Sequence, residues 1–223
     1  MMQCIKIFAL AFLSVLVTTT CAQSENSVIN RDFPSGSLAN QVDTSLITDI
    51  PCSPPCWYGI EPGKTSIQEA QSIVQSLPFV KKVNLFDGNE LTWSSLVTDW
   101  AGGVIVFDAS GNVETIRYDL EYDMKVNDLI AKQGIPESFL LFPGSSSVGE
   151  IEIFWPNSGL VANIHIVNMN FTAYETTPPI RPDSRIDGVV YSQSPMDLSK
   201  IISSHPELYF KWNNYQPIGA PTR

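Results

Sequence analysis

Two stretches of the chain place apolar residues at helical spacing. In residues 66–77 the apolar positions recur every three or four residues, at Ile67, Ala70, Ile73, Val74 and Leu77. Ser66 and Glu69 have the spacing of a capping box and a proline follows the last apolar position, so a helix with two defined ends is predicted. Residues 126–137, VNDLIAKQGIPE, predict a second, short helix that ends at Gly134.

Elsewhere the apolar residues alternate with polar ones, which is the pattern of half-buried strands. This alternation predicts six strands, with the sequences LTWSSLV, GGVIVFD, VETIRYDL, SFLLF, EIEIFW and LVANIHIV. The segments DASGN and PNSG are rich in turn-forming residues and lie between neighbouring strands. Consecutive strands are therefore expected to pair as antiparallel hairpins.

The two halves of this pattern resemble each other. VIVF-DASGN-VETIRY and IEIF-WPNSG-LVANIHI each contain a strand, a turn and a second strand, and each comes after a predicted helix. The predicted fold class is α+β, with tandem helix-plus-antiparallel-sheet units at residues 51–122 and 123–173. Residues 174–223 form a C-terminal extension with the strand GVVYS, a helix from Ser194-Pro195 and an aromatic tail expected to fold back onto the sheet.

The N-terminus has the pattern of an export signal. In residues 1–22 an apolar run from Ile7 to Val17 follows a lysine and precedes small residues, and the run is too short to span a bilayer permanently. Signal peptidase could cut after Ala22, or Cys21 could be the acylated residue of a lipoprotein, and both routes remain open. Residues 23–50 are polar and predict a flexible tether, so the mature protein is expected to be lipid-anchored in the cell envelope or secreted.

Charge excludes one class of partner. The 223 residues carry a formal net charge of -10, and no basic stripe offsets it. Such a surface repels phosphate backbones, so no nucleic acid is expected as a ligand.

Cys52 and Cys56 have the spacing C-x3-C, whereas redox pairs of the thioredoxin type use C-x2-C at a helix start. Prolines fill the intervening loop. In an exported protein a structural disulfide is the simplest interpretation, with a redox pair or a metal site as the alternatives.

Two short motifs suggest catalysis but fail on spacing. The GKT of residues 63–65 lacks both the preceding strand and the glycine five positions before Gly63 that a phosphate loop needs. GSSSVG, residues 144–149, misses the spacing of a nucleophile elbow by one position. No catalytic residue, metal or cofactor is predicted.

The segment PCSPPCWYGIEPGKTSIQEA resembles the opening of uncharacterised bacterial envelope lipoproteins with a P-C-x-P-P-C-W-x-G-I-x-P-G motif. The order of elements, the G-I-P after the second helix and an F-x-x-x-G turn resemble the fold of β-lactamase-inhibitor proteins and small outer-membrane assembly lipoproteins. These resemblances imply a fold and a compartment, and they assign no functional residue.

Several polar residues are candidate ligands. His165 alternates with apolar neighbours in a predicted strand, and His205 precedes a proline; a structural role is expected for both. Asp119, Glu121 and Asp123 would share one face of a strand. Their spacing is similar to the start of a calcium loop, but the glycine and the closing glutamate are missing, so a solvated face is expected and a calcium site stays an alternative.

Aromatic residues supply the last candidate site. Trp93, Trp100 and Trp212 could form a platform for a glycan or peptide, although filling the core is the simpler role for such residues. The expected function is non-enzymatic binding of a protein or another envelope component. Glycan binding is the alternative, followed by a hydrolase whose acids the sequence does not reveal.

Overall fold

A computed structural model describes residues 42–97, 102–143, 148–167 and 171–218. The expected signal peptide, Cys21, Trp100 and most of the expected tether lie outside these residues. The chain divides into a unit Met1–Phe33 and a unit Pro34–Arg223, and all described residues belong to the second.

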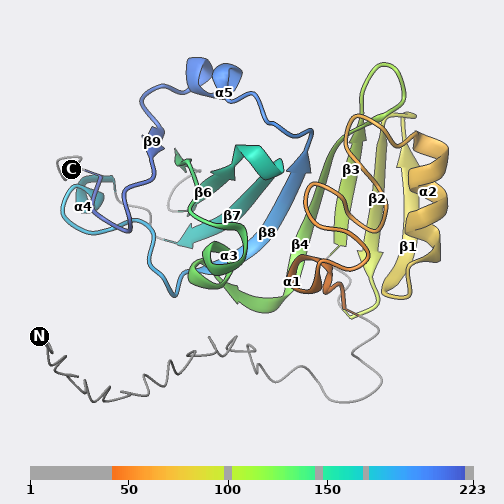
Figure 1. Ribbon diagram of the computed structural model, residues 1–223, viewed down its shortest axis with the longest axis horizontal. Coiled ribbons are helices and arrows are strands. Elements are labelled where there is room, and N and C mark those ends of the chain that lie inside the picture. The colour runs from red at the N-terminus through yellow and green to blue at the C-terminus, as the bar shows by residue number, and fades with distance from the viewer. Residues whose placement is uncertain (1–41, 98–101, 144–147, 168–170, 219–223) are drawn as a thin grey trace, which may run out of the picture. The chain divides into compact units, whose positions relative to one another are not determined.

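The described residues form one antiparallel sheet of nine strands (Figure 1). Its strand order is β1-β2-β3-β4-β8-β7-β6-β5-β9. The strands are β1 Val80–Phe86, β2 Glu90–Ser95, β3 Gly102–Phe107, β4 Val113–Lys125, β5 Ser138–Pro143, β6 Val148–Trp155, β7 Leu160–Val167, β8 Arg185–Ser192 and β9 Tyr209–Lys211.

Short helices accompany the sheet, so the fold is mixed α+β with strands predominating. They are α1 Ser45–Thr48, α2 Ile67–Ser76, α3 Val126–Gln133, α4 Phe171–Tyr174 and α5 Ser199–Ser204, with a 3-10 turn η1 at Pro156–Ser158. Helix α2 comes directly before the meander β1 to β4, and α3 comes directly before β5, β6 and β7. Strand β8, from the segment expected as an extension, pairs with both β4 and β7 in the middle of the sheet.

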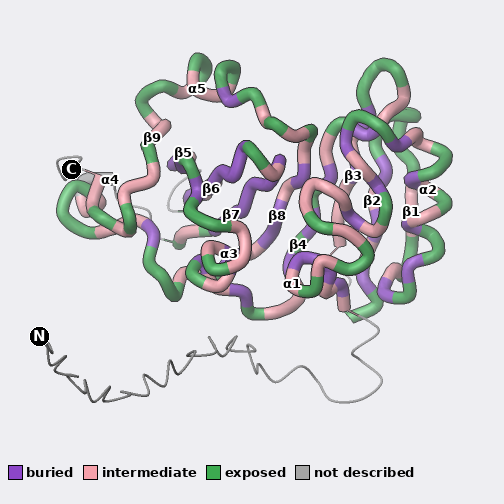
Figure 2. The backbone as a smooth tube through the Cα atoms, viewed as in Figure 1, coloured by how far each residue is buried: buried purple, intermediate pink, exposed green. Residues whose placement is uncertain are grey.

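One face of the sheet carries the main core. Alternate residues of the strands point into it, among them Ile105, Tyr118, Ile153 and Ala162. Residues of α1, α2, α3 and the loop at 51–66 join this cluster, and Figure 1 shows α1 and α3 in front of the strands. We call this the core face. In Figure 2 the purple of buried residues runs along β6, β7 and β8, while α5 is green and pink.

The opposite face, which we call the open face, has a smaller apolar cluster at one end. Leu140, Phe154 and Val161 pack there against Leu198, which immediately precedes α5. Away from this end most strands place polar residues on the open face, such as Thr92, Arg117 and Asn163, whereas β3 places Val104 and Val106 there.

Most predicted elements are confirmed, including the capping box, in which the Ser66 hydroxyl accepts from Glu69 N–H and the Glu69 carboxylate accepts from Ser66 N–H. Helix α5 begins at Ser199, later than predicted, and the Asp197 carboxylate just before it accepts a hydrogen bond from Ser199 N–H at 2.9 Å. Strands β1 and β9 and helices α1 and α4 were not predicted. The aromatic tail lies against the sheet, where β9 pairs with β5.

The end of the expected tether is packed on the core. Leu46 is fully buried, and the side chain of Asp43 is held by hydrogen bonds from the loop that follows. Residues 42–50 therefore belong to the folded unit, and the flexible-tether prediction is wrong for them. The physical reason is tertiary, because the two side chains that donate to Asp43, Trp57 and Tyr58, lie beyond Cys56 and out of reach of any local pattern.

Candidate binding surface on the open face

The structure confirms the disulfide between Cys52 and Cys56, with Cα atoms 5.6 Å apart. Gly59 N–H points at the Cys52 sulfur from 3.4 Å. The bridge closes the proline-rich loop directly before Trp57, which is fully buried and stacks on Trp93 with ring centroids 4.8 Å apart. This loop is thereby fixed to the core face.

A buried carboxylate lies next to that stack. Asp43 Oδ2 accepts from the Trp57 indole at 2.7 Å, and its Oδ1 accepts from Ser45 N–H at 2.8 Å and from the Tyr58 hydroxyl at 3.2 Å. Burial raises the pKa of Asp43, while these hydrogen bonds act to lower it. Both carboxylate oxygens have partners, so the group serves to attach residues 42–50 to the fold.

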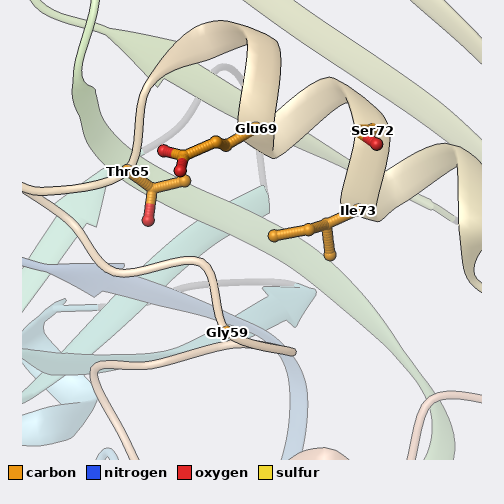
Figure 3. A pocket seen from close by; sticks show the side chains of 5 residues that line it. All are labelled: Gly59, Thr65, Glu69, Ser72 and Ile73. Atoms are coloured by element: carbon orange, nitrogen blue, oxygen red, sulfur yellow. The ribbon is translucent and has the colours of Figure 1, made fainter.

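A small pocket opens between this loop and α2 (Figure 3). Gly59, Thr65, Glu69, Ser72 and Ile73 line it, and its volume is about 230 Å³. Glu69, the one carboxylate among them, already caps the helix, and the Thr65 hydroxyl accepts from Glu61 N–H. The pocket therefore offers no free acid–base pair.

The open face brings together polar residues from strands far apart in the sequence. The register places Asp119, Gly188, Asn163 and Glu152 in one row across β4, β8, β7 and β6. Gly188 contributes no side chain, and a Cβ at this position would lie 3.0 Å from the Tyr118 carbonyl oxygen and 3.6 Å from Asp119 Oδ1. Arg117, two residues before Asp119, reaches Glu150 on β6.

Glu150 is the centre of the hydrogen bonds in this group. Its Oε1 accepts from Asn163 Nδ2 at 2.5 Å and from Arg117 Nη2 at 3.2 Å. Asn163 is 1% exposed, and its Oδ1 has no hydrogen-bond partner. One acceptor in the middle of the group is thus buried and unsatisfied.

Glu152 lies beside them on the same strand and face. Burial is the main cause that raises its pKa to about 7, and the charge of Glu150 adds to the rise. Arg117 and the Asn163 amide oppose it. We call Arg117, Glu150, Glu152 and Asn163 the carboxylate–amide cluster.

His165 borders this cluster and has an acidic partner that the sequence did not suggest. Its Nδ1 lies 3.4 Å from Asp187 Oδ2, and its backbone N–H donates to the same oxygen at 2.7 Å. Arg185 Nε lies 3.7 Å from Asp187 Oδ1. Asp119 is nearby, and burial raises its pKa against the charges of Arg117 and His165.

The three alternating acids do not form one regular face. The pairing of β4 with β8 is interrupted between Asp119 and Met124, and Asp123 forms an ion pair with Lys125 at 2.7 Å. Within the residues that the structure describes, no group of three or more His, Cys, Asp or Glu side chains is arranged to hold a metal ion.

The tryptophans of the proposed platform are not brought together. Trp93 is 6% exposed on β2, whereas Trp212 follows β9 at the far edge of the sheet and packs on Phe139 and Tyr215. Trp100 lies outside the described residues. His205 contacts the edge of the Phe142 ring.

Comparison of the chain with protein-family models, curated proteins and solved structures finds no match. Among the described helices, none combines the length and apolar character needed to cross a membrane.

Proposed function

We propose that this chain is an exported envelope protein that binds another protein or envelope component without catalysing a reaction, and that it binds through the open face. Cys21 is the proposed lipid anchor, with secretion after cleavage at Ala22 as the other route. The resemblance to envelope lipoproteins and the export-signal pattern of residues 1–22 support this compartment.

One observation carries the proposal for the surface. On the open face, the carboxylate–amide cluster and the neighbouring His165–Asp187 pair occupy adjacent strands in the middle of a rigid sheet. The helices α1, α2 and α3 contribute to the opposite cluster, and the segment around α5 covers only the apolar end. Specific side chains on a sheet face that no helix of the described residues covers at this point are what a binding surface requires.

The arrangement as two tandem units is part of the proposal. It is supported by the order of elements, since a helix precedes a run of antiparallel strands in each unit. Strand β8 of the extension pairs with β4 of the first unit and β7 of the second. No observation favours glycan binding, because Trp93 and Trp212 are separated by most of the sheet.

Site-specific photo-crosslinking in intact host cells tests the surface. A photoreactive residue at Thr115, next to Arg117 on the open face, is expected to capture one dominant protein. The matched control is the same residue at Gln75, which is exposed on α2. Equal capture from both positions, or capture from Gln75 alone, would place the binding surface elsewhere.

A further inference from the structure

We propose that the carboxylate–amide cluster receives an arginine side chain of the binding partner, whose guanidinium contacts Glu152 and the Oδ1 of Asn163. This inference rests on the proposed function and names the chemistry of the partner at the open face.

The cluster contains two carboxylates but only one positively charged side chain. Two carboxylates, Glu150 and Glu152, lie two residues apart on one face of β6, and Arg117 is bonded to Glu150. In the part of the chain that the structure describes, no ion pair is formed by Glu152. A second cation would therefore neutralise the second carboxylate.

Asn163 gives an independent indication. Its Nδ2 is used by Glu150, while its Oδ1 is buried and has no donor. A buried acceptor without a donor costs free energy, and a bound N–H group would remove that cost. The ligand must therefore present a hydrogen-bond donor as well as positive charge.

A guanidinium meets both requirements at once. Its five N–H donors are fixed in a plane, so it can form two bonds to a carboxylate and still reach a neighbouring oxygen. The register places the half-buried Phe142 opposite Glu150, which provides apolar surface for the methylene stem of an arginine. The net charge of -10 also attracts a basic partner.

Binding should depend on pH, because the guanidinium pairs with ionised Glu152. The groups that face Glu152 are Glu150 from its own strand, Asn163 from β7, Arg117 from β4 and the apolar Leu140 from β5. Since the pKa of Glu152 is raised to about 7, affinity should increase about tenfold between pH 6 and pH 8.

The experiment is an NMR titration of the folded protein with Nα-acetyl-arginine methylamide. The side-chain signals of Asn163 and Arg117 report binding. The uncharged citrulline analogue is the matched ligand control and requires no variant. Arginine-specific shifts that strengthen from pH 6 to pH 8 are expected; equal shifts with citrulline would overturn the inference.

The variant Glu152→Gln should weaken arginine binding at pH 8 at least tenfold and abolish its pH dependence. Glu114→Gln, at an exposed position of β4, is the control and should bind as the parent does. An unchanged affinity in folded Glu152→Gln would also overturn the inference.

The two experiments distinguish failure of the arginine inference from failure of the proposed function. If the photoreactive residue at Thr115 captures a partner but arginine does not bind, only the arginine inference fails. If arginine binds but no protein is captured, the proposed function fails.

Discussion

Asp43 on the core face is a buried carboxylate and Glu152 on the open face a half-buried one, and burial raises the pKa of each. They differ in their partners. Asp43 accepts three hydrogen bonds that use both of its oxygens. Glu152 lies beside a second carboxylate and an amide whose oxygen lacks a donor. Burial alone therefore does not identify a binding site, whereas an incomplete set of partners does.

The largest effect should come from removing the aromatic contact of the core-face group. Trp57→Ala deletes a fully buried ring that stacks on Trp93 and donates to Asp43, so the free energy of unfolding should decrease by about 3–5 kcal/mol. Urea denaturation measures this. Trp212→Ala, at a half-buried ring, is the control and should cost clearly less; equal losses would contradict the central role given to Trp57.

Asp43→Asn tests the carboxylate itself. An amide nitrogen would face the N–H and O–H donors that now point at Asp43, so a loss of about 2–3 kcal/mol in the free energy of unfolding is expected. Asp87→Asn, at an exposed turn residue, is the control. A neutral effect of Asp43→Asn would show that residues 42–50 contribute little to the folded unit.

Glu152→Gln should increase the free energy of unfolding at high pH, in contrast to the two substitutions above. A raised pKa in the folded state means that the folded protein binds a proton more tightly, so stability decreases as pH rises from 4.5, the ordinary pKa of a glutamate, through about 7. The variant lacks this loss and should be more stable than the parent at pH 8 by on the order of 2 kcal/mol. At pH 4 the two proteins should be similar. Thermal unfolding across this range checks the prediction, which fails if the parent is the more stable at pH 8.

The smallest effect is expected for Arg117→Ala. Its ion pair with Glu150 is about half exposed on the Arg117 side, and such pairs contribute less than about 1 kcal/mol. Stability should therefore change little, while the pKa of Glu152 should rise further because an opposing positive charge is lost. The carboxyl signal of Glu152 in an NMR pH titration measures this; an unchanged pKa would remove Arg117 from the cluster.

Local patterns predicted most of the fold. The capping box of Ser66 and Glu69, the helix ending at Gly134 and the alternating strands are confirmed because each depends on neighbours within a few residues. Strand β1 was missed because its exposed Lys81 and Lys82 interrupt the alternation at an edge of the sheet. The fully buried Leu46 was missed because the polar residues around it concealed a tertiary contact.

The candidate site could not be predicted in the same way. Arg117, Glu150 and Asn163 become neighbours only through the strand order β4-β8-β7-β6, in which the two outer strands come from different halves of the chain. The alternation of apolar and polar residues predicted which residues share a face within one strand, and His165 was correctly placed on the face opposite Ile164 and Ile166. This alternation does not show which strands are neighbours in the sheet, so Asp187 was not recognised as the partner of His165.

The position of β8 has a consequence for the order in which the protein can assemble. The chain is synthesised from its N-terminus, and β4 and β7 are complete before β8 leaves the ribosome. Until then both strands carry unpaired backbone groups along the edges that β8 later joins. A nascent chain that stops before Arg185 therefore has unpaired strand edges at both β4 and β7. Until β8 is synthesised and pairs with them, the chain is most prone to aggregation.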